Sequence, residues 1–169
     1  SVNASGLTGT TATIGWTTDQ TADSQVDYGL TTAYGSTTTL NATLVTAHSQ
    51  NLTGLIVGTP YHYRVRSTNG VGLLATSADA TFTTIALPVI SAVSSSGLTG
   101  TAATIGWTTD QTADSQVEYG LTTAYGSTTT LNAALVTAHS QNLTAPTNGT
   151  TYHYRVRSTN GVGLLATSA

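Results

Sequence analysis

The stretch YHYRVRS at residues 61–67 alternates apolar and polar side chains along its length. Such alternation is typical of a half-buried β-strand, because successive side chains of an extended chain point to opposite faces. The two tyrosines and Val65 then face a core, and His62, Arg64 and Arg66 face outward. The stretch therefore predicts one strand of a sheet that is buried on one side.

This stretch belongs to an internal repeat. A shift of 91 positions, the difference between Trp107 and Trp16, superposes residues 6–78 on residues 97–169 without an insertion or deletion. Agreement this close indicates duplication of one unit. The two copies differ at eight pairs of positions, which are Thr11/Ala102, Asp27/Glu118, Thr43/Ala134, Gly54/Ala145, Leu55/Pro146, Ile56/Thr147, Val57/Asn148 and Pro60/Thr151.

The repeat divides the chain into two expected domains, residues 1–87 and residues 88–169. A unit of this size can bury a core of its own, removing roughly 60% of its unfolded surface from water. Pro88 fixes its own φ and pushes Leu87 toward extended geometry, so we expect a short linker with restricted hinge motion.

Each copy is expected to be all-β. The stretches ATIGW at residues 12–16 and SQVDYG at residues 24–29 alternate with the same period of two. Short turns rich in glycine, asparagine, aspartate and threonine separate them, and no stretch shows helical periodicity over three turns. About seven short strands in such a unit predict a sandwich of two sheets.

Several motifs give each copy a family resemblance. Trp16 in the second expected strand, VDYG at residues 26–29 and LTGLIVGTPYHYRV at residues 52–65 resemble a fibronectin type III domain. The resemblance covers the whole unit and implies an immunoglobulin-like sandwich. It places the strands of the first copy near residues 2–7, 10–17, 24–29, 34–40, 46–52, 61–67 and 75–84.

The resemblance also implies a tyrosine corner, in which a tyrosine hydroxyl ties the chain to nearby backbone. Leu55, Gly58 and Tyr61 fit that motif. In the second copy Pro146 replaces the leucine, so we expect a looser corner around Tyr152. The stretch DSQVDYGLTTAYG further resembles the sandwich domain beside the catalytic domain of purple acid phosphatases and domains of bacterial secreted proteins, a likeness that implies fold rather than activity.

Composition excludes several classes of partner. Charged residues make up 7% of the chain, against about 25% in an average soluble domain, and the net charge is −3. Without a basic cluster we expect no nucleic-acid partner, and without an apolar run of about 18 residues we expect no membrane insertion. The absence of cysteine excludes disulfides. Abundant threonine, serine, glycine and alanine favour an extracellular or cell-surface protein.

The charged residues predict ion pairs between neighbouring strands. Asp27 should pair with Arg64 or Arg66, because the strands that carry them are expected to be antiparallel neighbours. The same reasoning pairs Glu118 with Arg155 or Arg157. Two alternatives stay open. The acidic residues could bind calcium; this set is Asp19, Asp23 and Asp27 with Asp110, Asp114 and Glu118. The outward basic stripe of His62, Arg64 and Arg66 could receive a carboxylate or sulfated sugar, although pairing of the stripe with Asp27 is the simpler account.

The core is expected to contain the large aromatic residues, namely Trp16, Trp107, Tyr61, Tyr152 and Phe82. His48 and His139 fall in expected strands, where a partly buried histidine bonded to backbone is the ordinary case and a pH switch the alternative.

The second copy ends at Ala169, the counterpart of Ala78, before any equivalent of the stretch DATFTT that contains Phe82. We expect either a longer array in which this stretch continues or a strand donated by a neighbouring molecule.

These features favour a structural role. Selection for a longer protein favours duplication of a unit, whereas a specific binding or catalytic site needs to occur only once. The leading hypothesis is a non-catalytic spacer of a longer extracellular protein that forms a stalk, fibre or filament, with neighbouring repeats or copies of itself as partners. The alternatives are a module that binds cell-surface carbohydrate or protein, and an accessory domain pair of a secreted hydrolase. No catalytic residue, metal or cofactor is expected.

Overall fold

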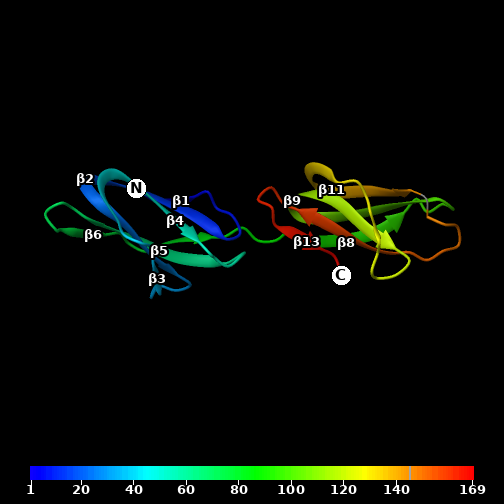
Figure 1. Ribbon diagram of the computed structural model, residues 1–169, viewed down its shortest axis with the longest axis horizontal. Helices are drawn as coiled ribbons and strands as arrows, with labels where there is room; N and C mark the ends of the chain where they lie inside the picture. Colours follow the sequence, from blue (N-terminus) through cyan, green and yellow to red (C-terminus); the bar gives the residue numbers. More distant parts are fainter. Residues whose placement is uncertain (145) are drawn as a thin grey trace. The chain divides into compact units, whose positions relative to one another are not determined.

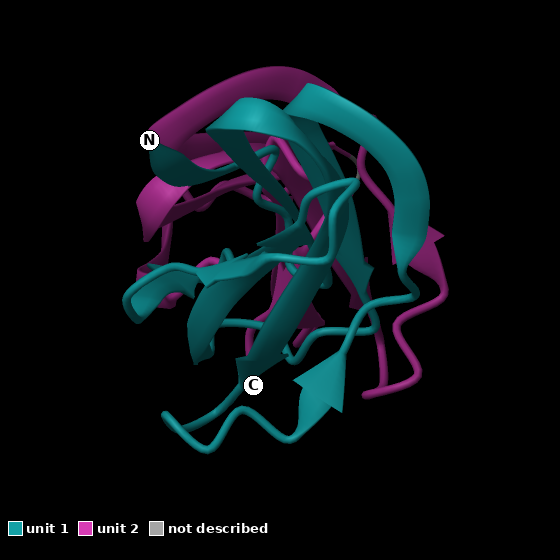
Figure 2. Ribbon diagram, turned by 90° about the vertical axis from the view of Figure 1, so that its left-hand side faces the viewer, with its two compact units in different colours: residues 1–86 teal, residues 87–169 magenta. Residues whose placement is uncertain are grey.

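The computed structural model describes residues 1–144 and 146–169, and these form two compact units, Ser1–Ala86 and Leu87–Ala169. Figure 2 colours the two units separately. The boundary lies one residue before the one expected from the sequence. Strands and turns account for both units, which confirms the expected all-β fold. The described residues contain no helix that is long and apolar enough to cross a membrane.

Unit 1 forms two layers of antiparallel strands (Figure 1). One layer has the order β1, β2, β4, and the other contains β3, the second half of β2, β5, and then β6 and β7 at different points along β5. The strands are β1 (Val2–Ser5), β2 (Thr11–Gly29), β3 (Ser36–Thr37), β4 (Asn41–Thr53), β5 (Pro60–Thr68), β6 (Leu74–Thr76) and β7 (Ala80–Thr83).

Unit 2 repeats this plan. In its described part, β8 takes the place of β1, β9 that of β2, and β12 and β13 those of β5 and β6. Its strands are β8 (Ile90–Ser96), β9 (Ala102–Gly120), β10 (Ser127–Thr128), β11 (Asn132–Thr144), β12 (His153–Thr159) and β13 (Leu165–Thr167).

The long strand β2 belongs to both layers of unit 1. Its first half pairs with β1 and β4, so that Trp16 lies opposite both Val2 and His48. Its second half pairs with β5, where Val26 lies opposite Val65. One continuous backbone therefore connects the two sheets, and β9 does the same in unit 2.

The expected boundaries of several strands were wrong. The two strands expected at residues 10–17 and 24–29 are a single strand, because the intervening segment contains no glycine or proline and stays extended. The strand expected at residues 34–40 shrinks to β3, since Tyr34 N donates to Thr31 O at 2.9 Å to close a turn, and Tyr34 and Gly35 then take positive φ values, 61° and 92°. That turn lies so close to Gly29 that a Cβ there would meet Tyr34 O at 1.4 Å, so only glycine fits.

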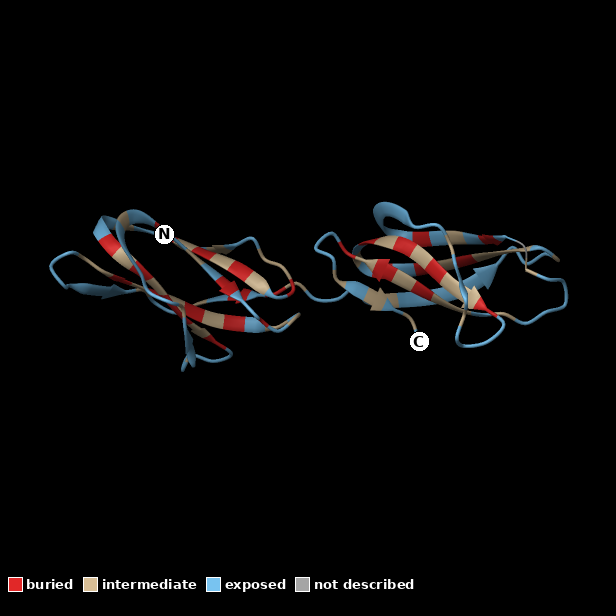
Figure 3. Cartoon of the chain, viewed as in Figure 1, coloured by how far each residue is buried: buried red, intermediate tan, exposed pale blue. Residues whose placement is uncertain are grey.

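The core of unit 1 lies between its two layers. Buried and half-buried residues alternate along β2 and β5 in Figure 3, as the period of two requires. Trp16, Tyr61 and Phe82 are all buried, with 4%, 6% and 7% of their surface exposed. The indole N–H of Trp16 donates a hydrogen bond of 2.9 Å to Ser67 Oγ, which satisfies its one buried polar group.

The core of unit 2 is smaller. Trp107 is buried, but Tyr152 and Tyr154 are only half-buried. For Tyr152 this contradicts the expected burial. The reason is the absence, from the described residues of unit 2, of a strand equivalent to β7, which covers the same tyrosine positions in unit 1. Without that partner β12 begins at His153, whereas the equivalent strand β5 begins two positions earlier, at Pro60.

Candidate functional site

A charged cluster occupies the outer face of β2 and β5 in unit 1. Arg64 Nε donates to Asp27 Oδ2 at 2.9 Å, and Arg66 Nη1 lies 3.7 Å from Asp27 Oδ1. The hydroxyl of Thr37 also donates to Asp27 Oδ1, at 2.9 Å. The carboxylate is nearly covered, with 7% of its side chain exposed, while both arginines reach water. The structure thus brings together the three residues that the sequence placed in one cluster.

Unit 2 builds the same cluster around Glu118. Arg155 Nε donates to Glu118 Oε2, and Arg157 Nη1 donates to Oε1 at 2.9 Å. The longer side chain of glutamate reaches the second arginine more closely than aspartate does in unit 1. The hydrogen bond from Arg155 is the main reason why the pKa of Glu118 lies below its ordinary value. The exchange of aspartate for glutamate therefore preserves the ion pairs.

A tyrosine that sequence reasoning missed completes each cluster. The guanidinium carbon of Arg64 lies 4.7 Å from the ring centroid of Tyr34, and Arg155 lies at the same distance from Tyr125. Both tyrosines have φ near 60°, a conformation that is rare for residues with a side chain. The signal in the sequence is the pair Tyr–Gly, in which both residues can share a tight turn.

His62 has a different partner from the one expected. Its Nδ1 lies 2.9 Å from Asp79 Oδ2, and the other oxygen of Asp79 accepts a hydrogen bond of 3.1 Å from the Tyr34 hydroxyl. The outward basic residues are thus paired within unit 1, His62 with Asp79 and the two arginines with Asp27. A carboxylate or sulfated ligand would have to displace these acids.

A histidine stacks on the core tryptophan in each unit. The rings of Trp16 and His48 lie 4.9 Å apart and 8° from parallel, and Trp107 and His139 repeat this with 4.9 Å and 7°. The sequence led us to expect a histidine bonded to backbone. Instead, side-chain hydroxyls contact both ring nitrogens, Thr18 and Ser24 of β2 in unit 1 and Thr109 and Ser115 of β9 in unit 2.

The hydroxyl partners determine the tautomer of His48. Thr18 Oγ1 donates its single proton to Gln20 O at 2.7 Å, so it must accept from His48 Nε2, which lies 2.8 Å away. The proton is then on Nε2, and Nδ1 accepts from the Ser24 hydroxyl at 2.8 Å. Burial lowers the pKa of His48, which favours this neutral form. The same contacts surround His139, whose pKa burial also lowers.

The acidic residues near the loops anchor backbone. Asp23 Oδ1 accepts a hydrogen bond of 2.6 Å from Thr68 N, and Asp114 accepts one of 2.7 Å from Thr159 N. Asp110 accepts a hydrogen bond of 2.7 Å from Val89 N. Outside Ala145, no three metal-ligating side chains gather into a group that could hold an ion.

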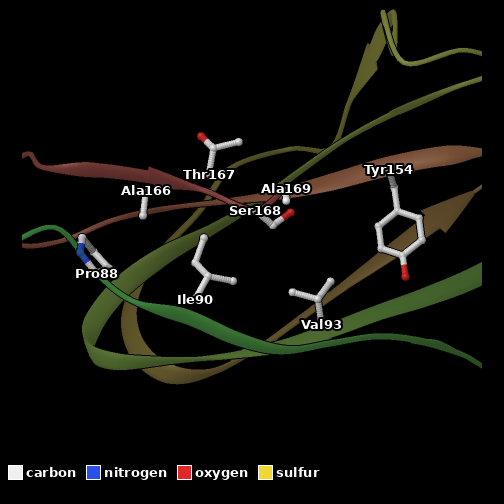
Figure 4. Close-up of a pocket in the computed structure, with 8 residues that line it drawn as sticks. All are labelled: Pro88, Ile90, Val93, Tyr154, Ala166, Thr167, Ser168 and Ala169. Atoms are coloured by element: carbon white, nitrogen blue, oxygen red, sulfur yellow. The ribbon is translucent and has the colours of Figure 1, made fainter.

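A groove opens along unit 2, between β8 and the strands β12 and β13. Figure 4 shows Ile90 and Val93 on one side, the final residues Ala166–Ala169 on the other, and Tyr154 at one end. This part of the groove has a volume of about 550 Å³. A second part of about 340 Å³ continues past Tyr154 to Tyr152 and Leu98. We call both parts together the open groove.

In unit 1, β7 occupies the position that corresponds to the second part of the open groove. It pairs with β5, with Phe82 opposite Tyr61 and Ala80 opposite Tyr63. The residue that follows β7, Thr84, is also buried and donates to Ile56 O at 2.6 Å. In unit 1 this position is therefore filled by an extended strand that carries an aromatic side chain.

The tyrosine corner is present in both units. Ile56 N donates to the Tyr61 hydroxyl at 3.0 Å, and Thr147 N donates to the Tyr152 hydroxyl at 3.2 Å. Leu55, which belongs to the corner motif, is buried in unit 1. Its counterpart Pro146 is half-buried, and the hydrogen bond of the second corner is exposed. These differences have the direction expected for a looser corner.

Comparison with known proteins identifies the class of domain. Residues 1–83 match the family model of the fibronectin type III domain. Unit 1 belongs to this family, since the match covers nearly all of it, and unit 2 repeats its sequence and strand pairing. The resemblance inferred from the tryptophan and tyrosine motifs is confirmed.

Solved structures that align with this chain include a two-domain fibronectin type III segment from chicken tenascin. It is 19% identical, with a TM-score of 0.40, and the alignment covers 99% of this chain and 95% of the tenascin segment. The FN1–FN3 domains of chicken CNTN1 are 16% identical, with a TM-score of 0.42, and the alignment covers 100% of this chain and 63% of that one.

A curated relative is endoglucanase B of Cellulomonas fimi, which is 36% identical over 174 residues. The alignment covers 96% of this chain but only 16% of the endoglucanase. The chain thus spans a small part of the length of this relative.

Proposed function

We propose that the chain is a non-catalytic spacer in a longer extracellular protein, where tandem domains form a stalk, fibre or filament. The observation that carries this proposal is the repetition of one internal framework. The tryptophan–histidine stack, the arginine–tyrosine contact and the tyrosine corner occur in both units with nearly the same distances. These contacts stabilise each unit from within, which is what a spacer requires.

The positions that differ between the copies also support a spacer. Five of the eight fall in the short segment from Gly54 to Pro60 and its counterpart, and two others replace threonine by alanine. The remaining exchange, Asp27 for Glu118, keeps the ion pairs. Variation therefore gathers in one loop while the framework stays constant, as selection for a repeated building unit predicts.

The spacer role can be tested by changing the number of repeats. Chains with two, four and six copies of residues 1–91 should show a maximum dimension in small-angle X-ray scattering that increases by an equal step per copy. A glycine–serine chain of equal length is the control, because its dimension grows only with about the square root of length. If the maximum dimension of the repeat chains also increased only with about the square root of their length, the proposal would be contradicted.

A second candidate function is that of an accessory domain pair in a secreted hydrolase. The relative named endoglucanase B favours it, because a segment of that enzyme aligns with nearly the whole of this chain. The test joins this chain to an endoglucanase catalytic domain and measures soluble sugar released from insoluble cellulose. A glycine–serine linker of the same length replaces the chain in the control. Equal release by both proteins would exclude this function and leave the spacer proposal intact.

A third possibility, a module that binds carbohydrate or protein, finds less support in the charged clusters. Within unit 1 the outward basic side chains contact their own acids, and Tyr34 covers one face of Arg64. Retention of the isolated chain on insoluble cellulose or on a sulfated glycan column would favour binding over spacing.

A further inference from the structure

Three asparagine–glycine pairs occur in the chain, at Asn69–Gly70, Asn148–Gly149 and Asn160–Gly161. An asparagine before glycine is chemically labile, because glycine has no Cβ to block its backbone nitrogen from the side-chain amide carbon. The three pairs share this intrinsic reactivity. They differ in what the folded protein does with the asparagine side chain.

Asn69 is held in place at both ends of its amide. Its Oδ1 accepts hydrogen bonds from Val71 N at 3.2 Å and Leu73 N at 2.9 Å, and its Nδ2 donates to Gln20 Oε1 at 2.8 Å. These contacts direct the side chain into the loop ahead of it. The amide carbon cannot turn toward Gly70 N until the three hydrogen bonds open.

Asn160 is held in the same way in unit 2. Val162 N and Leu164 N donate to its Oδ1 at 3.2 Å and 3.0 Å, and its Nδ2 donates to Gln111 Oε1 at 2.9 Å. It is also buried, with 6% of its surface exposed. Both copies of the Asn–Gly–Val–Gly loop therefore protect their asparagine.

Asn148 differs from both. It is exposed at the tip of a turn closed by a hydrogen bond of 3.2 Å from Thr150 N to Thr147 O. Its side-chain amide makes no hydrogen bond with any residue that the structure describes. The backbone nitrogen of Gly149 is likewise without a hydrogen bond to the described chain. The equivalent position in unit 1 is Val57, so this pair exists in unit 2 alone.

We propose that Asn148 is a site of spontaneous deamidation in the folded protein, whereas Asn69 and Asn160 are protected. Gly149 N, after losing its proton to solvent, forms a bond to Asn148 Cγ. The bond from Cγ to Nδ2 breaks, and ammonia leaves with the proton it needs. Water then opens the five-membered succinimide at either carbonyl, which gives aspartate or isoaspartate and requires no further reactant.

The modification changes the corner of unit 2. It adds one negative charge, so the net charge goes from −3 to −4. Isoaspartate also inserts an extra backbone carbon next to Thr147, whose N–H donates to the Tyr152 hydroxyl. The reaction therefore places a time-dependent chemical change beside the less buried of the two tyrosine corners.

The size of the protection follows from the hydrogen bonds. Each hydrogen bond of ordinary net strength lowers the population of the open side chain by about fivefold, so three lower it by about a hundredfold. Deamidation at Asn148 should therefore be about a hundredfold faster than at Asn69 in the folded chain. In the unfolded chain the rates at the three sites should agree within a few-fold.

The experiment incubates the full chain at mildly alkaline pH and follows each site by peptide mapping with mass spectrometry. Each deamidated peptide gains the mass difference between an amide NH₂ and a hydroxyl group. The same incubation in concentrated urea measures the intrinsic rates. Selective conversion of Asn148 in buffer, together with similar rates in urea, supports the proposal. Equal rates at Asn148 and Asn69 in buffer would overturn it.

A matched variant tests the cause of the protection. Gln20→Ala removes the acceptor for Asn69 Nδ2 and should raise the rate at Asn69 by about fivefold, the factor for one hydrogen bond. The rates at Asn148 and Asn160 in the same molecule serve as internal controls and should not change. An unchanged rate at Asn69 would show that these hydrogen bonds do not protect it.

Discussion

The ring of Phe82 stacks on the ring of Tyr61, with 5.6 Å between their centroids and 9° between their planes. Phe82 also contacts Tyr63 in a tilted arrangement at 5.7 Å. In unit 2 the corresponding tyrosines, Tyr152 and Tyr154, line the open groove instead. The aromatic side chain of Phe82 on β7 thus fills the core of unit 1, and the corresponding position in unit 2 is open.

This relationship predicts that unit 2 gains stability when the chain is extended. Addition of DATFTT, the sequence of residues 79–84, after Ala169 should place its phenylalanine in the open groove. Burial of that side chain should raise the free energy of unfolding of unit 2 by about 1.5–3 kcal/mol. Thermal unfolding of residues 87–169 with and without the extension measures the change.

The control for this prediction is the extension DATATT, which keeps the backbone of the added strand and removes the aromatic ring. It should recover only part of the gain. Identical melting temperatures for all three proteins would show that the groove does not accept the strand.

Replacement of the core tryptophan should be severe. Trp16→Ala removes a buried side chain, its stack on His48 and its hydrogen bond to Ser67, and should cost about 3–5 kcal/mol of the free energy of unfolding. Urea denaturation followed by circular dichroism measures the loss. Thr17→Ala, at the exposed neighbouring position, is the control and should have little effect.

The charged cluster predicts a tolerated and a costly substitution at one position. Asp27→Glu should be nearly neutral, because Glu118 makes the same ion pairs at the equivalent position. Asp27→Asn should cost about 1 kcal/mol, at the low end for charged hydrogen bonds since Arg64 and Arg66 are well exposed. Denaturant midpoints at low and high salt should differ less in Asp27→Asn than in the parent protein. Equal losses for both substitutions would contradict this account.

The two stacked histidines predict sensitivity to acid. Burial lowers the pKa of His48 and His139 below their ordinary value of 6.5. Between that value and the lower pKa of the folded state, the unfolded chain binds more protons than the folded chain does. The stability that the neutral imidazoles contribute is therefore complete above pH 6.5 and is lost as the pH falls through the folded-state pKa.

The measurement is the urea midpoint of the chain between about pH 7.5 and pH 5, the range in which histidine titrates. This range also stays above the ordinary pKa of Glu118, 4.5, so that carboxylate contributes little to the profile. Replacement of both His48 and His139 by Gln should flatten the profile. A parent protein with the same midpoint at both ends of the range would refute the prediction.

Much of the fold could be predicted because period-two alternation and the repeat are direct properties of the residues. The pairing of Asp27 with Arg64 followed from strand order alone, since the two residues lie opposite each other on neighbouring strands. The strand boundaries were harder, because they depend on turns. The segment between Thr17 and Ser24 contains no glycine or proline, but that alone does not show that a single strand passes from one sheet to the other.

The remaining errors concern residues whose environment depends on a distant strand. Tyr152 has the same sequence neighbours as Tyr61 on its C-terminal side, yet its burial depends on whether a strand equivalent to β7 lies against it. The contact of His62 with Asp79 also requires the position of the segment before β7. Alternation along one strand contains no information about either.

The sharing of β2 between both sheets has a mechanical consequence. A pulling force can pass between the two sheets of a sandwich through side-chain packing, through loops or through a strand that both sheets share. Here the tension that β1 delivers to the first half of β2 reaches β5 along covalent bonds of the same strand. We therefore expect a unit under a pulling force to unfold by shearing the hydrogen bonds along β2. The two sheets would not separate from each other as intact layers.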